Sequence, residues 1–228
     1  DEGKHRIRRQ HKLELMSHLA FYLWREGLSG LPAAQLQDWF HEWRESAPRL
    51  RGAYASVSSE QLEEDLRTAT FLARVDDRKG STYRFAHTSL QEYFLARALL
   101  QAVEHDRSEL WTMKIPSRET LEFFTQLLAE RDDPALLATL GRWRHHDDVR
   151  VTQLLLQITL IAHAAGLPTP RLDGIRLERA KLDDLIIDGR GGSRPRLSLA
   201  GATVSHASLR RAQGGRFDLS RAPFNQNC

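Results

Sequence analysis

The chain has 228 residues, of which 41% are hydrophobic, enough for one large domain or two small ones with real cores. Basic residues outnumber acidic ones by only 33 to 30, so the net charge of +3 does not mark the whole chain as a nucleic-acid binder. After residue 170, however, 11 Lys and Arg residues face 6 Asp and Glu residues. This asymmetry predicts two differently built regions.

Cys228 is the only cysteine, which excludes an intramolecular disulfide and a thiolate metal cluster. The longest apolar stretch, residues 154–167, contains polar residues and falls short of the roughly 18 residues that a membrane span requires. The first residues are charged, contain no apolar signal core and do not begin with Met. We therefore expect a cytoplasmic protein without a membrane span, whose chain begins inside a longer protein.

Helical spacing of apolar residues predicts a helix over residues 5–27 and a second one from Pro32 to the break before Pro48. A linker rich in Gly, Ala and Ser should follow. Ser58 and Gln61 then have the spacing of a capping box, which indicates the start of a third helix.

Residues 71–75 and 82–86 are short, rich in aromatic and aliphatic residues, and separated by a polar loop that contains Gly80. This pattern predicts a β-hairpin. Residues 88–104 are apolar nearly all round, as expected for a helix enclosed by its neighbours. Helices followed by a hairpin predict a winged-helix domain over residues 1–105.

Three further helices are predicted over residues 118–131, 134–144 and 148–165. They form an all-helical connector domain over residues 106–169, which ends where two closely spaced prolines stop the helix. The five tryptophans of the chain lie on helical faces, so we expect them in the core: Trp24, Trp39, Trp43, Trp111 and Trp143.

Beyond residue 170 apolar residues recur every five positions, with one two-residue slip at 191–195. The repeat centres are Leu172, Leu177, Leu182, Ile187, Leu199, Val204, Leu209, Gly214, Leu219 and Phe224. Small or apolar residues also stand two positions before nine of the centres: Ile175, Ala180, Leu185, Leu197, Ala202, Ala207, Ala212, Phe217 and Ala222. A five-residue period with two inward positions suits a stack of coils. A strand or loop region with an accidental period is the alternative.

The pattern resembles the pentapeptide-repeat family, in which Ala-(Asp/Asn)-Leu-x-x recurs. The predicted repeat domain is residues 170–228, of which the resemblance covers about 170–226. Its clearest units are Ala180–Leu182, Ala207–Leu209 and Phe217–Leu219. It implies a right-handed quadrilateral β-helix after the mainly α region with its winged-helix hairpin. Gly214 at a repeat centre and the Gly-Gly-Ser insertion depart from the pattern.

Residues 83–96 read Tyr-Arg-Phe-Ala-His-Thr-Ser-Leu-Gln-Glu-Tyr-Phe-Leu-Ala. They resemble the winged-helix segment of NACHT-type STAND NTPases, in which Phe-x-His-x-Ser-x-Gln-Glu-Tyr-Phe-x-Ala recurs. This class of nucleotide-switched proteins includes animal inflammasome receptors and bacterial anti-phage proteins. The resemblance covers about residues 7–105. It implies that His87 contacts the β-phosphate of ADP, which a nucleotide-binding domain outside this chain would hold.

The position of His87 fits such a contact, because it would stand just before a helix whose free N–H groups and dipole favour an anion. A neutral imidazole can still donate one hydrogen bond to phosphate. The alternative is a histidine that only ends a strand. The motif is supported by Phe85, Ser89, Gln91, Glu92 and Tyr93, of which the last three are expected to fix the helix in its packing.

The chain has no Gly-x-x-x-x-Gly-Lys-(Ser/Thr) loop, because residues 79–82 carry similar letters in the wrong order. We therefore expect no catalytic residue here and an ATPase in the parent protein. Consecutive residues on a turn point in different directions, so we do not expect His145, His146, Asp147 and Asp148 to bind a metal. Asp147 or Asp148 is more simply the N-cap of the next helix.

These patterns predict the regulatory and sensing portion of a bacterial NACHT-type STAND NTPase in anti-phage defence or stress signalling. Its partners would be the upstream nucleotide-binding domain and a trigger such as a phage protein, with oligomerisation on activation. A nucleotide-independent interaction scaffold is the first alternative. DNA binding through the basic hairpin residues Arg74, Arg78, Lys79 and Arg84 is the second. We do not expect it, because the third helix is acidic: Glu60, Glu63, Glu64 and Asp65.

Overall fold

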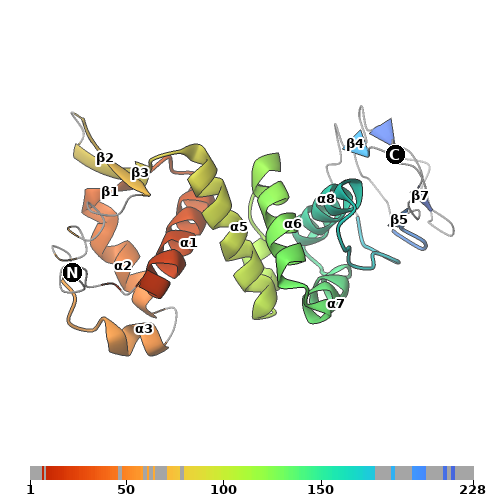
Figure 1. The fold of residues 1–228 in the computed structure, drawn as a ribbon, viewed down its shortest axis with the longest axis horizontal. Helices are drawn as coiled ribbons and strands as arrows, with labels where there is room; N and C mark the ends of the chain where they lie inside the picture. The colour runs from red at the N-terminus through yellow and green to blue at the C-terminus, as the bar shows by residue number, and fades with distance from the viewer. Residues whose placement is uncertain are drawn as a thin grey trace. The chain divides into compact units, whose positions relative to one another are not determined.

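The computed structural model describes residues 7, 9–45, 48–58, 61, 64, 71–77, 80–177, 186–187, 197–203, 213–214 and 217–218. The chain folds as two compact units, residues 1–98 and 99–228 (Figure 1). The division falls inside helix α5 (Thr88–Glu104). The described part is mainly helical and contains a small antiparallel sheet. The division into three domains stays a prediction.

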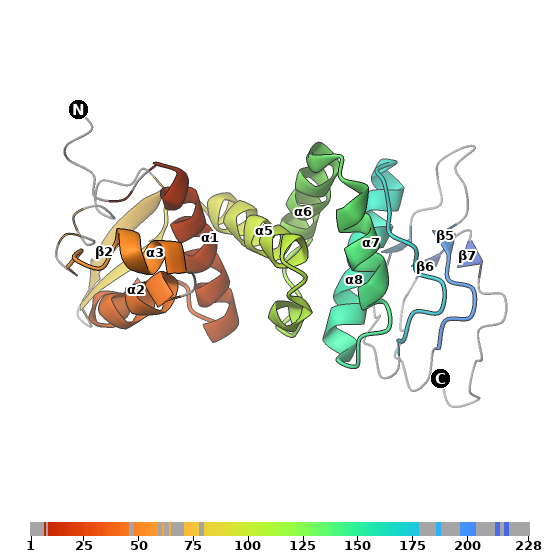
Figure 2. The same ribbon diagram turned by 90° about the horizontal axis from the view of Figure 1, so that it is seen from below.

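In the described part of the first unit, helices pack beside a three-stranded antiparallel sheet (Figures 1 and 2). The strand order is β1-β3-β2, so the short first strand pairs with the second strand of the hairpin. The elements are α1 (Arg9–Glu26), β1 (Leu31–Pro32), a 3₁₀ turn (Ala33–Gln35), α2 (Leu36–Glu45), α3 (Pro48–Ala53), β2 (Leu72–Asp77), β3 (Gly80–Phe85) and the first part of α5.

The core of this unit is strongly aromatic. Trp43 packs against Phe40 at 5.5 Å and against Tyr54 at 5.4 Å between ring centroids. His11 Nδ1 and the Tyr54 hydroxyl share a buried hydrogen bond of 2.6 Å. Four of the five tryptophans are buried as predicted, but Trp24 is only partly buried, because it stands beside the buried face of α1 that Leu23 occupies.

The predicted start of the second helix at Pro32 is wrong. Pro32 lies in β1 and pairs with Thr82 of β3, so the second helix begins only at Leu36. α3 occupies part of the predicted linker. The first helix begins at Arg9, because Ile7 lies in a bend. A two-residue strand and a six-residue helix are too short to leave a period in the sequence.

The predicted hairpin is present, but its strands are longer than expected. They extend to Asp77 and Gly80, so the predicted six-residue loop is wrong. Polar side chains bond across the exposed end of the hairpin: Arg74 of β2 donates to Ser81 of β3 at 2.7 Å, and the Ser81 hydroxyl donates to Asp76 of β2 at 2.5 Å. These polar side chains stabilise the outer end of the hairpin strands. Because this end has no alternation of apolar and polar residues, the sequence pattern did not indicate that the strands continue.

The capping box is confirmed. The Ser58 amide donates to Gln61 Oε1 at 3.2 Å, and the Gln61 amide donates to Ser58 Oγ at 3.4 Å. Apart from Gln61 and Glu64, the third helix that follows lies outside the described residues, as do Arg78 and Lys79 at the hairpin tip.

The second unit confirms the predicted connector helices closely. It contains the end of α5, a 3₁₀ turn (Ser108–Trp111), α6 (Arg118–Arg131), α7 (Pro134–Trp143) and α8 (Val149–Ala165). Ser117, Asp133 and Asp148 cap the N-termini of α6, α7 and α8. Gly166 ends α8 in the left-handed conformation, with φ of 73°.

α8 packs beside α6, and most of its side chains are buried (Figures 1 and 2). A buried aromatic cluster adds to this core: Trp111 makes edge contacts with Phe124 at 5.5 Å and with Trp143 at 5.0 Å between ring centroids. The Trp111 indole also donates to the Leu99 carbonyl at 3.3 Å. Helix packing and aromatic edges therefore hold α5 to α8 together.

After α8 the described residues form short parallel pairs. Arg176 bridges to Thr203, and β4 (Ile186–Ile187) pairs with β6 (Gln213–Gly214), a separation of 27 positions in both cases. β5 (Leu197–Ser198) pairs with β7 (Phe217–Asp218) at a separation of 20 positions. The chain thus returns alongside itself in the same direction.

The predicted inward positions are buried wherever the structure describes their side chains. These positions are Leu172, Ile175, Leu177, Leu199 and Ala202, which are 5% exposed or less. Arg171, Arg176 and Gly201 between them are exposed. Most other inward positions of the repeat region lie outside the described residues, including Leu182, Leu209, Leu219 and Phe224.

Gly30 provides a test of the packing between β1 and β3. A Cβ atom on this residue would lie 3.0 Å from the Tyr83 carbonyl oxygen and 2.6 Å from the Thr82 methyl group. We expect Gly30→Ala to lower the free energy of unfolding by about 1–3 kcal/mol, because the overpacked strands must move apart. Urea denaturation measures this change.

Gly52→Ala is the matched control, because nothing lies within 4 Å of its added methyl group and the residue is on α3. It should leave stability unchanged or raise it by up to about 1 kcal/mol. Equal destabilisation by the two substitutions would contradict the packing argument.

The buried His18 should make the stability of the first unit sensitive to acid. Burial lowers the pKa of His18 from 6.5 to about 4, although Glu42 nearby raises it. Its Nε2 is buried, has no hydrogen-bond partner among the described residues, and belongs to a ring 5.9 Å from that of Trp39. Protonation therefore favours the unfolded state, and the free energy of unfolding should fall by at most about 3 kcal/mol between pH 6.5 and 4.

His18→Phe, which keeps a ring but cannot be protonated, should flatten this fall. His41→Gln, on the exposed side of α2, should leave it unchanged. Urea denaturation at a series of pH values compares them. An identical pH dependence in the wild type and His18→Phe would refute a role for His18.

Candidate functional site

The predicted motif lies where β3 ends and α5 begins. Phe85 is buried at the end of β3, and its ring stacks on that of Phe94 at 5.8 Å. The Ala86 amide donates to the Phe71 carbonyl at 2.9 Å, and the Leu90 amide donates to the His87 carbonyl at 3.1 Å. These bonds fix the backbone on both sides of His87.

The side chain of His87 is exposed, as are those of Thr88 and Ser89 in the first turn of α5. The first turn contains no acidic residue that would offset the positive end of the helix dipole. The N–H groups at a helix start have no partner within the helix. An anion can therefore approach the imidazole and this turn without displacing packed side chains.

The other motif residues divide into two groups. Ser89 is exposed beside His87, whereas Gln91, Glu92 and Tyr93 are partly buried. The Tyr93 ring makes an edge contact with Phe94 at 5.4 Å, and the Arg97 guanidinium lies 6.0 Å above it. The geometry thus brings Ser89 and His87 together on the surface. The ligand role of His87 stays a prediction.

The residues 145–148 are used to build a turn. The Asp148 amide donates to His146 Nδ1 at 2.9 Å, and Asp147 forms an ion pair of 2.8 Å with Arg176. A hydrogen bond from Arg150 lowers the pKa of Asp148, which also caps α8. Among the described residues, no group of three or more His, Cys, Asp or Glu side chains could hold a metal ion.

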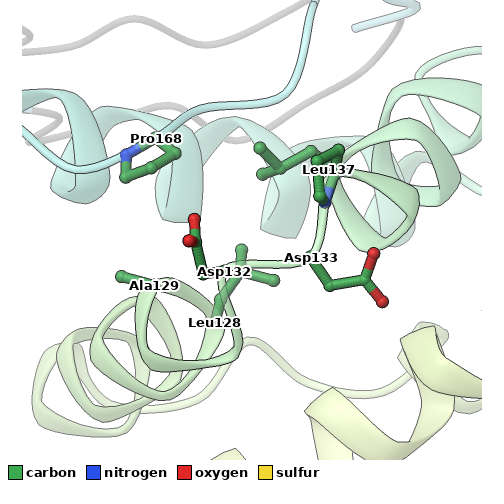
Figure 3. Close-up of a pocket in the computed structure, with 7 residues that line it drawn as sticks. Leu128, Ala129, Asp132, Asp133, Leu137 and Pro168 are labelled. Atoms are coloured by element: carbon green, nitrogen blue, oxygen red, sulfur yellow. The ribbon is translucent and has the colours of Figure 1, made fainter.

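A pocket that the sequence did not indicate lies in the second unit (Figure 3). Its volume is about 50 Å³, and Leu128 and Ala129 of α6, Leu137 of α7 and Pro168 form its walls. In Figure 3 the carboxylate of Asp132 is turned toward Pro168. Only the Asp-Asp-Pro sequence between two helices could have drawn attention to this place.

No family model, curated protein or solved structure matches the chain. Among the described helices, none combines the length and the apolar character that crossing a membrane requires.

Proposed function

We propose that the chain is the regulatory and sensing portion of a bacterial NACHT-type STAND NTPase. Its first unit would hold the ADP-bound resting state by contacting the nucleotide phosphate through His87. The observation that carries the proposal is the position of this histidine: the motif residue is exposed at the positive end of α5, while its neighbour Phe85 is buried.

The topology of the first unit supports a winged helix. A short strand between the first two helices pairs with the last strand of the hairpin, and the sheet order is β1-β3-β2. The same chain order of helices and strands is expected when a hairpin forms the wing of a helix-turn-helix unit. The helix that would face a ligand in such a unit lies mostly outside the described residues.

Strand pairing supports a coil of pentapeptide repeats after residue 170. The separation of 20 positions between Leu197 and Phe217 equals four repeats of five, one for each side of a four-sided coil. The separation of 27 positions between Ile186 and Gln213 exceeds four repeats by seven, which is one further repeat of five and the two-residue slip. The burial of Ile175 and Ala202 fits inward positions two residues before a repeat centre.

In this proposal the C-terminal region receives the trigger, and the first unit controls whether the nucleotide stays bound. A trigger that binds the open state more tightly than the closed state shifts the population toward the open state and favours assembly. The nucleotide itself would be held mainly by a domain outside this chain, and the reaction would take place there.

The histidine contact is tested with His87→Ala in the complete protein that contains this chain. A hydrogen bond to a charged phosphate is worth roughly 1.5–3 kcal/mol, so ADP should dissociate about 10- to 100-fold faster. The protein should also signal without its trigger. Release of a fluorescent ADP analogue measures the first effect.

His87→Gln keeps a hydrogen-bond donor and should restore part of the ADP retention. The control is His105→Ala, because His105 follows α5 directly, is exposed, and its ring hydrogen-bonds the Gln101 carbonyl of that helix. Unchanged ADP release in His87→Ala would favour the nucleotide-independent scaffold. Binding to duplex DNA that weakens steeply with added salt would favour the DNA-binding alternative.

A further inference from the structure

The pocket of Figure 3 has the composition of a site for one cationic side chain. We propose that it binds a lysine or arginine side chain from a segment of a partner protein. The proposal concerns the second unit and does not depend on the nucleotide contact of His87.

The walls of the pocket are apolar. Leu128, Ala129, Leu137 and Pro168 supply aliphatic surface, and the pocket volume is about 50 Å³. Sites for drug-sized or cofactor-sized molecules usually measure roughly 300–1,000 Å³. This pocket therefore accommodates the end of a single side chain and is too small for a nucleotide.

One carboxylate at the pocket has no partner within the described residues. The neighbouring Arg131 forms its ion pair with Glu104, at 3.0 Å, and not with Asp132. The Asp133 carboxylate accepts from the Ala135 amide at 2.9 Å and is turned away from Pro168 in Figure 3. Asp132 is thus the carboxylate that a ligand in the pocket would meet.

The turn that carries Asp132 is already held in place. Its amide donates to the Ala129 carbonyl at 3.2 Å, and the residue ends α6 with φ of 46°. Asp133 then caps α7, and Pro134 occupies the first turn. A partner would therefore not have to order the loop, which lowers the entropic cost of binding.

The apolar walls and the Asp132 carboxylate together determine which side chain the pocket can bind. Lysine and arginine have an aliphatic stem for the apolar walls and a cationic group for the carboxylate. The C-terminal end of α6 adds partial negative charge at the same place, and the Asp133 carboxylate offsets the positive N-terminus of α7 that also borders the pocket. An acidic side chain would be repelled by Asp132, and a purely apolar one would cover the carboxylate without pairing it.

The pocket suits a segment of a protein better than a free amine. An exposed ion pair and a few apolar contacts bind a short peptide weakly, and in a complex with a protein the rest of the binding energy comes from surrounding contacts. A complementary charge at such a site mainly selects the correct partner and its orientation.

The test uses two short peptides, acetyl-Ala-Lys-Ala-amide and the same peptide with norleucine, which has a similar stem but no charge. We expect the lysine peptide to shift the amide resonances of Ala129, Asp132 and Leu137 in the complete chain, and to bind about two- to fivefold more tightly than the norleucine peptide. A titration followed by ¹⁵N NMR measures both.

Asp132→Asn should abolish the preference for lysine, and Asp133→Asn should retain it. Both substitutions preserve the backbone role, since asparagine tolerates the left-handed conformation and is a good N-cap. Equal binding of the two peptides, an equal loss in the two variants, or no saturable shift would overturn the proposal. Shifts of the same amides on concentrating the free chain would assign the pocket to a second copy and would also overturn it.

Discussion

The packing of Phe94 against the end of the sheet determines the geometry of the first unit. Its ring lies 5.3 Å from that of Phe71 and 5.8 Å from that of Phe85, so α5 is fixed to the end of β3 and to the residue that precedes β2. Because Phe85 faces the core, the chain must reverse over the next two residues. This reversal leaves His87 exposed at the helix start, where the proposed phosphate contact requires it.

A second connection joins the helices of the second unit to the parallel strands that follow. The Arg176 amide donates to the Arg144 carbonyl at 3.0 Å, and Arg144 Nε donates to the Asp173 carbonyl at 2.8 Å. On the other side the Leu177 amide donates to the Thr203 carbonyl at 2.8 Å. The α7–α8 turn therefore fixes residues 173–177, from which the chain begins to pair with itself.

The two candidate sites use opposite ends of helices. At the start of α5 the N-terminus, whose first turn contains no acidic residue, favours an anion, and His87 adds a hydrogen-bond donor. At the end of α6 the C-terminus favours a cation, and Asp132 adds a carboxylate. In each case the side chain strengthens a charge that the backbone already presents. Each site consists of one side chain and one helix end, and each depends on the short turn that positions the side chain.

The sequence alone determined the long helices α5, α6, α7 and α8, the presence of the hairpin and the capping box, because each depends on local periodicity or on residues a few positions apart. It also indicated the inward positions such as Leu177, since a five-residue period is visible along the chain. Tertiary structure decided the rest. Pro32 became a strand because β3 offered it a partner, and the pocket exists because Pro168 approaches Leu128 from a distant part of the chain. Contacts between residues far apart in sequence leave no local period, so only the folded chain could reveal them.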